Sequence, residues 1–548
     1  MNFYPICCRP YAHDVSSIQP AGGHPGASLL SPVLRTPTGE PLSHPNWHMM
    51  RSVSHTRRRA PREENAVIAP GNSRAWSCLL FRGVLGLLLA VVPASCILAA
   101  TFNVNSLLDV VDALPGDGIC RTAPNNTVCT LRAALMEANS LPGADTINLQ
   151  ANSTYTLELP GTDGGSLNGD LDVRDSVTIL GEGAASTIID GNGLVVGDRV
   201  MTVCRCIADC VTETGSCPNG TDIVATISGV GFTHGRTATF AGGGLANLGH
   251  LTVRNCAFTD NFAYYGGGIL NLGTLDISNS TVSGNDVFAL GVGAGVYAGA
   301  GTMTMVDSSV RDNGMQGDPT NINGGGIEVS GVSTVATIMR STISNNRGGL
   351  GGGIHLQNGT LHLINTTVSG NLSYKSGGGL AVDSGTAGLY NVTIANNIAN
   401  ADAAGGTEFG GGVYRNTGSL TFRNSILSGN LHLNQAAPPS FEECFGGIIS
   451  AGNNIVTVVL GGICSISGSY SAVAASLGPL QNNGGPTLTH ALLDNSLAIN
   501  AGNPDGCTDN VANVLKKDQR GVQRPFGPAC DIGAVEAGDG IFRDGFES

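Results

Sequence analysis

Short stretches of alternating apolar and small polar residues recur through the middle of this chain. Residues 275–285 show the pattern clearly, and so do residues 361–371 and 420–430. Alternation with a period of two, rich in β-branched residues, is typical of short strands rather than of helices. The central region is therefore predicted to consist of many short strands.

These stretches lie between glycine clusters and asparagines at a nearly constant spacing. From the last glycine of a cluster to its asparagine is 17 to 20 residues, whereas the distance to the next cluster varies from 5 to 13. The clusters are 242–244, 266–268, 293–295, 324–326, 351–353, 377–379 and 410–412. The asparagines are Asn261, Asn285, Asn313, Asn346, Asn371, Asn397 and Asn430. A fixed stretch alternating with a variable one predicts a solenoid, in which each repeat is one coil.

The repeat length identifies the kind of solenoid. Units of about 24–33 residues with two or three strands predict an all-β fold, a right-handed single-stranded parallel β-helix with an N-terminal cap. The frame of a leucine-rich repeat is absent, and a propeller blade needs about 40 residues. Glycine and asparagine suit the sharp corners between strands, so we expect the asparagines to form a structural column of stacked amides. A second column lies six residues earlier, at Asn255, Asn279, Asn365, Asn391 and Asn424, with Asp307 and Arg340 in the intervening repeats.

The first 100 residues have a different character. Residues 1–75 are rich in Pro, Arg and His without periodicity, which predicts disorder or a start-site artefact. Residues 76–100 combine Arg82, a short apolar run and small residues, the pattern of a secretory signal peptide. The run is short and broken by Pro93, which disfavours a transmembrane helix. A lipoprotein cleavage site at Cys96 remains an alternative.

Charge narrows the class of partner. The chain has 27 Lys and Arg and 41 Asp and Glu, of which nine and four lie in the first 100 residues. The remainder therefore carries a net charge of −19. This balance disfavours nucleic acid and anionic polymers as partners. We expect a monomer.

The cysteines after residue 100 fall into local groups, which in an exported protein predict disulfides. The candidates are Cys120 and Cys129; Cys204, Cys206, Cys210 and Cys217; Cys444 and Cys464; and Cys507 and Cys530. The spacing of the second group is not that of a zinc site, although a metal knuckle there stays open. Cys256 lies in an alternating strand and is predicted to be a buried, inert thiol.

Residues 101–150 resemble the CSLREA domain of bacterial exported β-helix proteins. The resemblance rests on residues 129–135 (Cys-Thr-Leu-Arg-Ala-Ala-Leu), followed by Glu-Ala-Asn at 137–139. Thr130 and Ala133 stand where the family has Ser and Glu. The segment predicts a helix over 131–139, then a strand, and a cap for the open end of the solenoid.

Residues 151–475, the predicted repeats, resemble polymorphic outer-membrane proteins and pectin-lyase-like β-helices. Gly267-Gly268-Ile269 and Phe258-Thr259-Asp260-Asn261 match their Gly-Gly-Ala-Ile and Phe-x-x-Asn elements most closely. This resemblance implies a bacterial surface or extracellular location, reached by export.

Residues 476–537 resemble the C-terminal part of the choice-of-anchor group of exported proteins. The match covers Gly-Gly-Pro-Thr at 484–487, Ala-Ile-Asn-Ala-Gly at 498–502, Asp-Gln-Arg-Gly at 518–521 and Cys-Asp-Ile-Gly-Ala at 530–534. Residues 538–548 are either a sorting tag or a frayed end.

Catalytic chemistry has little support in the sequence. Glycoside hydrolysis needs two carboxylates at a defined separation, and the candidates are Asp307, Asp312 and Glu328. Further carboxylates on the coils are Asp170, Asp172, Asp190, Asp260, Asp276, Asp383 and Glu408. Asp170 and Asp172 share a strand face. For Asp172, Asp190 and Glu182, at cap-like coils, we expect a turn or solvated role, and His355 and His362 are expected to be solvated.

No histidines have metal-ligand spacing, so neither metal nor cofactor is expected; calcium would enter only with a lyase. We therefore predict a non-catalytic adhesin or structural rod, with a polysaccharide or a cell-surface molecule as ligand. The alternative is a polysaccharide lyase or glycoside hydrolase, with its site beside variable loops at 286–292, 314–323 and 398–409. Both readings fit the fold, because β-helices serve both purposes.

Overall fold

The computed structural model describes residues 99–206, 223–238, 241–314, 323–403, 408–434 and 437–538. Residue contacts divide the chain into two units, Met1–Val91 and Val92–Ser548, and all described residues belong to the second. The predicted segment 1–75, nearly all of the predicted signal peptide and the last ten residues lie outside the described residues, as do Cys210 and Cys217.

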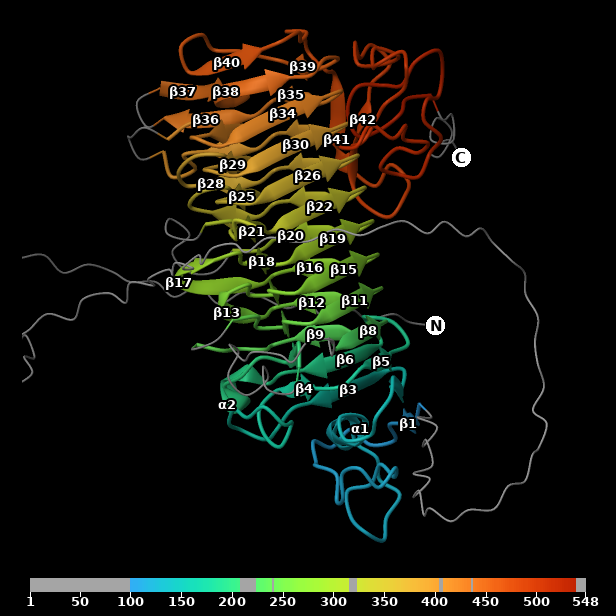
Figure 1. The fold of residues 1–548 in the computed structure, drawn as a ribbon. Coiled ribbons are helices and arrows are strands. Elements are labelled where there is room, and N and C mark those ends of the chain that lie inside the picture. The colour runs from blue at the N-terminus through green and yellow to red at the C-terminus, as the bar shows by residue number, and fades with distance from the viewer. Residues whose placement is uncertain are drawn as a thin grey trace, which may run out of the picture. The chain divides into compact units, whose positions relative to one another are not determined.

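The second unit is a right-handed parallel β-helix, as predicted (Figure 1). Each full coil passes through three stacks of parallel strands, which are named here stack C, stack A and stack B in the order in which the coil meets them. Stack C holds β4 (Leu171–Val173), β7 (Met201–Val203), β10 (Leu245–Asn247), β14 (Ile269–Asn271), β18 (Val296–Ala298), β21 (Ile327–Val329), β25 (Ile354–Leu356), β29 (Leu380–Val382) and β33 (Val413–Arg415).

Stack A holds β1 (Thr101–Asn103), β2 (Asp145–Asn148), β5 (Val177–Leu180), β8 (Val224–Ser228), β11 (His250–Arg254), β15 (Thr274–Ser278), β19 (Thr302–Val306), β22 (Val335–Met339), β26 (Thr360–Ile364), β30 (Thr386–Tyr390), β34 (Ser419–Arg423) and β40 (Cys464–Ser467). The long strand β38 (Cys444–Ser450) pairs with both β33 and β34 and joins the two stacks into one 22-stranded sheet.

Stack B has 11 strands: β3 (Ser153–Thr156), β6 (Thr187–Asp190), β9 (Gly231–Thr233), β12 (Ala257–Thr259), β16 (Thr281–Ser283), β20 (Ser309–Arg311), β23 (Thr342–Ser344), β27 (Thr367–Ser369), β31 (Thr393–Ala395), β35 (Ile426–Ser428) and β39 (Ile455–Val456). Alternation aims every second side chain inward, as Leu251 and Val253 of β11 show, and these side chains build one continuous core.

A fourth edge follows stack B. Six of its seven strands begin directly after one of the asparagines at the repeat spacing, and the last strand pairs antiparallel with the one before it. The edge comprises β13 (Phe262–Tyr265), β17 (Asp286–Val292), β24 (Arg347–Gly348), β28 (Leu372–Ser373), β32 (Ile398–Ala399), β36 (Leu431–Asn434) and β37 (Ala437–Phe441). The predicted loop at 286–292 is thus wrong, because these residues pair with β13 as a strand. Most of the predicted loop at 314–323 lies outside the described residues.

The seven asparagines form a continuous ladder at the corner between stack B and this edge. Each Nδ2 donates to Oδ1 of the asparagine on the next coil at 2.9–3.0 Å, from Asn261 through to Asn430. The residue before each asparagine has a positive φ, for example 56° at Asp260. The ladder satisfies buried amides that would otherwise cost folding free energy.

The glycine clusters pack against this ladder, which explains the constant spacing. A Cβ on Gly268 would lie 2.9 Å from Nδ2 of Asn285 and 2.7 Å from the carbonyl oxygen of Gly295. No side chain fits there. The third glycine of the cluster and the asparagine of the same coil therefore lie in contact, and this contact fixes the spacing between them.

The cap contains helix α1 (Leu131–Ala138), in agreement with the predicted helix. Thr130 caps its N-terminus by accepting a hydrogen bond from the Ala133 N–H. The buried Arg132 pairs with Asp109 and donates to the Gly169 carbonyl at 2.8 Å, which ties the helix to the first coils. The residues of the cap motif therefore attach the cap to the solenoid.

Residues 477–538 lie against the side of the β-helix and include the hairpin β41 (Leu477–Gln481) and β42 (Thr489–Leu492) (Figure 1). Three members of the second asparagine column hold this C-terminal region. Asn365 donates to the Lys517 carbonyl, Asn391 to that of Thr508 and Asn424 to that of Asp531. Their turn geometry leaves the amides pointing outward, where they bind another segment of the chain.

Disulfides join Cys120 to Cys129, Cys444 to Cys464 and Cys507 to Cys530. Cys204 and Cys206 each take part in a disulfide as well. Cys256 is a buried free thiol, and burial raises its pKa to about 11, so it stays protonated.

Candidate functional site

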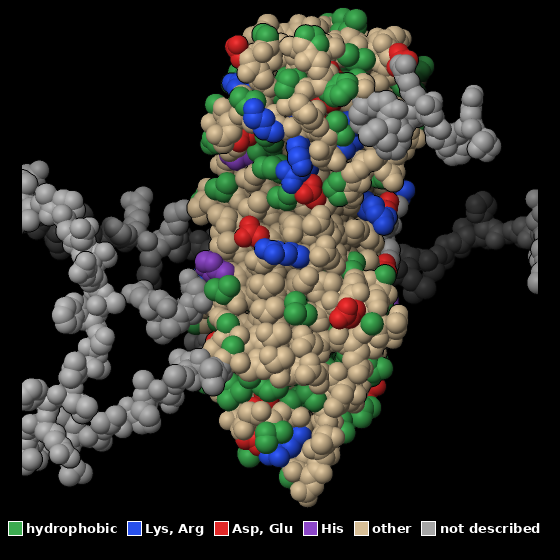
Figure 2. Space-filling view, turned by 90° about the vertical axis from the view of Figure 1, so that its right-hand side faces the viewer, with side chains coloured by type: hydrophobic (Ala, Val, Ile, Leu, Met, Phe, Trp, Pro, Cys, Tyr) green, Lys and Arg blue, Asp and Glu red, His purple; other side chains and the backbone are tan. Residues whose placement is uncertain are grey.

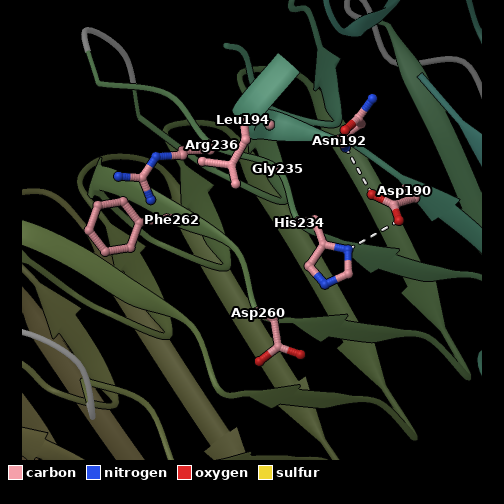
Figure 3. Close-up of a pocket in the computed structure, with 9 residues that line it drawn as sticks. Asp190, Asn192, Leu194, His234, Gly235, Arg236, Asp260 and Phe262 are labelled. Atoms are coloured by element: carbon pink, nitrogen blue, oxygen red, sulfur yellow. Dashed lines mark hydrogen bonds and ion pairs between the residues drawn. The ribbon is translucent and has the colours of Figure 1, made fainter. Parts of the chain in front are cut away.

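An open pocket of about 370 Å³ lies at the turn after stack B near the N-terminal end of the solenoid (Figure 3). It is lined by Asp190, Asn192, Gly193, Leu194, His234, Gly235, Arg236, Asp260 and Phe262. These residues come from the ends of β6, β9 and β12, from the short helix α2 (Gly193–Val196) and from the start of β13. Consecutive coils therefore place them side by side.

His234 lies between two carboxylates in this pocket (Figure 3). Its Nδ1 is 3.1 Å from Oδ2 of Asp190, and its side chain is 58% exposed. Asp190 also accepts a hydrogen bond from the Asn192 N–H at 2.8 Å. Within the described part of the chain, the exposed Asp260 carboxylate accepts no hydrogen bond, so it remains open to a ligand.

The opposite side of the pocket combines a cation with apolar surface. The guanidinium of Arg236 lies 4.3 Å from the ring centroid of Phe262 and 5.3 Å from that of Phe288. No hydrogen bond from this guanidinium to a described residue is present. Leu194, on α2, is 88% exposed. The pocket thus presents free donors, a free acceptor and apolar wall, the mixture found in small-ligand sites.

A second cluster crosses three neighbouring coils of stack C. The Nδ1 of His355 is 2.8 Å from Oε2 of Glu328, and its Nε2 is 3.3 Å from Oδ2 of Asp383. His355 and Glu328 are 1% and 2% exposed, whereas the Asp383 side chain is 28% exposed. Burial alone would lower the pKa of His355, but the two carboxylates outweigh it and raise that pKa to about 9.

The structure separates the three catalytic candidates from the sequence. Asp307 forms a two-point ion pair with Arg340 at the corner after stack A, with contacts of 2.7 and 2.8 Å. Asp312 pairs with Arg311 at the end of stack B. Glu328 lies in the middle of β21, on stack C. These carboxylates lie on different sides of the coil, so they do not form one site.

Two other expectations, those for His355 and Asp172, are wrong. His355 is buried between carboxylates rather than solvated. Asp170 and Asp172 are also buried, at 3% and 2% exposure: Asp170 accepts a hydrogen bond from Thr202, and Asp172 accepts one from the Ser166 N–H. Burial raises the pKa of Asp172 to about 9 and that of Asp170 to about 7. Sequence patterns signal burial poorly where a separate segment covers an outward-facing residue.

Arg236 and Phe262 did not stand out in the sequence. Only their positions in the repeat could have indicated them. Arg236 follows Gly235 and Phe262 follows Asn261, at the same point of two adjacent coils, and the two residues pair as a parallel bridge. Aligning the coils at the asparagine would have placed both on the same edge. His234 and Asp260 likewise occupy one equivalent corner on adjacent coils.

No metal-binding group of three or more His, Cys, Asp or Glu side chains occurs among the described residues. In the same part of the chain, no helix is long and apolar enough to cross a membrane.

No family model matches the sequence, and no curated protein matches it. Among solved structures, the chain is similar to pectate lyase Pel9A, with 16% identity over 80% of this chain and 97% of that one, at a TM-score of 0.39. It is also similar to the A-module of mannuronan C-5 epimerase AlgE4 from Azotobacter vinelandii, with 16% identity over 62% and 95% of the two chains and a TM-score of 0.31. A third, the catalytic domain of a GH87 α-1,3-glucanase, has 12% identity over 63% and 66%, at 0.21. With scores below 0.5, these likenesses carry no inference about ligand or reaction; the chain's own strands establish it as a parallel β-helix protein.

Proposed function

We propose that this chain is an exported, non-catalytic β-helix protein that binds a polysaccharide along its side, as an adhesin or structural rod of the cell surface. The observation that carries the proposal is the open pocket lined by Arg236, His234 and Asp260. In Figure 3 the Arg236 guanidinium lies over Phe262 on one side, and His234 and Asp260 lie on the other. A sugar offers hydroxyl groups to such polar side chains and C–H surface to apolar ones.

The arrangement of the outward aromatic residues supports an extended ligand. Tyr264, Tyr265 and Tyr297 form ring contacts of 5.0 and 5.2 Å next to the pocket's edge. Farther along the solenoid, Phe409, Tyr414 and Phe445 stack at 4.7 and 5.2 Å. By contrast, the side shown in Figure 2 is dominated by neutral side chains and backbone, with scattered charges. A polymer that runs along the coils therefore meets aromatic surface repeatedly on the side that carries these tyrosines and phenylalanines.

Binding without cleavage is supported by the state of the two pocket carboxylates. Asp190 is engaged by His234 and by a backbone N–H, which leaves Asp260 as the open carboxylate of the pocket. Acid hydrolysis needs a second carboxyl group free to act on the same bond.

Cleavage is the alternative, and one observation favours it. Asp190 and Asp260 lie two coil steps apart, about 10 Å at the spacing of neighbouring strands, near the upper end of the range for inverting hydrolases. Export and surface location are supported by the disulfides and by the resemblance of residues 101–150 and 476–537 to exported proteins.

The test is incubation of the purified chain with a panel of neutral and acidic polysaccharides, with and without calcium. Bound polymer is measured by affinity electrophoresis, and released oligosaccharides by chromatography. We expect retardation by at least one neutral polymer and no product. Released product would establish the hydrolase or lyase alternative, and absence of binding to every polymer would refute the proposal.

A further inference from the structure

The cluster of Glu328, His355 and Asp383 is too costly to be explained by stability alone. Three ionisable groups are stacked on an outward sheet face, and two of them are fully buried. Buried ion pairs are weak contributors to stability, because desolvation offsets their attraction. Clusters of this kind are instead frequent at functional sites.

The cluster presents one carboxylate to solvent in a fixed orientation. Whichever of Glu328 and His355 holds the shared proton, the three groups together carry one net negative charge, centred on Asp383. The hydrogen bond from His355 lowers the pKa of Asp383, so that carboxylate stays ionised. Its Oδ1 has only a long contact of 3.4 Å with Nδ2 of Asn416 and keeps acceptor capacity.

Aromatic surface adjoins this carboxylate. Tyr414 lies on the next coil. The residue after it, Arg415, pairs with Val382, which directly precedes Asp383. Burial and the charge of Asp383 both raise the pKa of Tyr414, so its hydroxyl remains a donor. The Tyr414 ring stacks on Phe445 at a 16° angle between ring planes, and both are partly exposed.

Among the described residues, Asp383 pairs with His355 and forms no ion pair with the neighbouring Arg415. Arg415 directs its Nε to the carbonyl oxygen of Gly418 at 2.7 Å. An ionised carboxylate beside aromatic rings is the arrangement that binds ammonium groups. The net charge of −14 for the whole chain also attracts cationic ligands.

We infer that Asp383, Tyr414 and Phe445 form a second saccharide subsite and that it takes a protonated amino sugar. His355 and Glu328 are positioning residues, which hold the carboxylate without touching the sugar. This inference rests on the proposed polysaccharide binding. Five coil steps, about 24 Å along the axis, separate the Asp260 coil of the pocket from that of Asp383. The pocket lies at the corner after stack B and Asp383 directly after a stack C strand, so each subsite binds its own stretch of saccharide.

The test compares two ligands that differ in charge on the same backbone. Binding of a glucosamine hexamer and of its fully N-acetylated form to the full chain is measured by calorimetry at mildly acidic pH. We expect the glucosamine hexamer to bind about tenfold more tightly. Asp383→Asn removes this preference, whereas the matched surface control Asp312→Asn keeps it. His355→Asn weakens the preference without changing affinity for the N-acetylated hexamer.

Several outcomes overturn the inference. Equal affinity for the two hexamers, or a preference that persists in Asp383→Asn, excludes an ammonium site at Asp383. Binding of a lysine hexapeptide with equal strength and the same dependence on Asp383 assigns the site to a protein ligand instead. Thermal unfolding of each variant shows whether a loss reflects misfolding. If neutral polysaccharides still bind and lose affinity in Arg236→Ala, only the second subsite fails; if no saccharide binds at all, the proposed function fails with it.

Discussion

The side-chain amide of Asn430 donates to Oε2 of Glu443 at 2.6 Å, so the asparagine ladder ends on a carboxyl group. Glu443 is 0% exposed and also accepts a hydrogen bond from the Gly429 N–H. The last amide of the ladder thus has a partner where no further coil supplies an asparagine. This ending links the repeat to the pH dependence of folding.

Stability is predicted to fall as the pH rises from mildly acidic to alkaline. Burial raises the pKa of Glu443 to about 7, so the folded state holds its proton more tightly than the unfolded state does. The resulting stability is fully present below the unfolded pKa, near 4.5, and is lost as the pH rises through about 7. Asp531, with a pKa raised by burial to about 6, acts in the same direction.

The variant Glu443→Gln isolates this contribution, because the amide resembles the protonated carboxyl. Thermal unfolding monitored by circular dichroism at pH 5 and pH 8 is the measurement. We expect a smaller fall in melting temperature between the two conditions than in the wild type. An unchanged fall in the variant means that Glu443 does not titrate in this range.

Removing one amide from the middle of the ladder is predicted to destabilise the fold strongly. Asn371 donates to Asn397 and to the Ile343 carbonyl and receives hydrogen bonds from Asn346. Asn371→Ala leaves buried partners unsatisfied, at a cost of about 2–4 kcal/mol. The control is Asn255→Gly, an exposed corner residue with φ of 53°, expected to change stability by less than about 0.5 kcal/mol. Equal losses in urea unfolding of the two variants argue against a special role for the ladder.

The C-terminal region is predicted to depend on Gln519. This buried side chain donates from Nε2 to the Ser341 carbonyl and to Oγ1 of Thr342, both at 3.0 Å. Gln519→Ala should cost about 2 kcal/mol and speed proteolysis within residues 477–538. The exposed Gln523→Ala serves as the control. Cleavage at the same rate in both variants shows that other contacts hold the region.

Much of this architecture could be predicted from the sequence. The spacing of glycine and asparagine indicated a parallel β-helix because both residues meet at one corner of each coil, as Gly268 and Asn285 do. The outward amides of the second column could not be assigned their partner, because Asn365 binds Lys517, more than 150 residues away.

The candidate site was harder to predict for a related reason. Asp190, His234 and Asp260 converge only after three coils are aligned, and their sequence separations give no local motif. The buried state of His355 depends on carboxylates from two other coils, Glu328 and Asp383. The sequence pattern of a single repeat predicts whether a side chain points inward or outward, but not which side chains of the neighbouring coils contact it.

The most direct test of the proposed function is the affinity of the full chain for the neutral polysaccharide that it binds, measured for the wild type and for Arg236→Ala. Arg236 has free donors in the pocket, so we predict a loss of about tenfold in affinity. The control Arg311→Ala, which removes an exposed arginine outside the pocket, should bind as the wild type does. Unchanged affinity in Arg236→Ala, with the fold intact, would contradict the assignment of this pocket as the binding site.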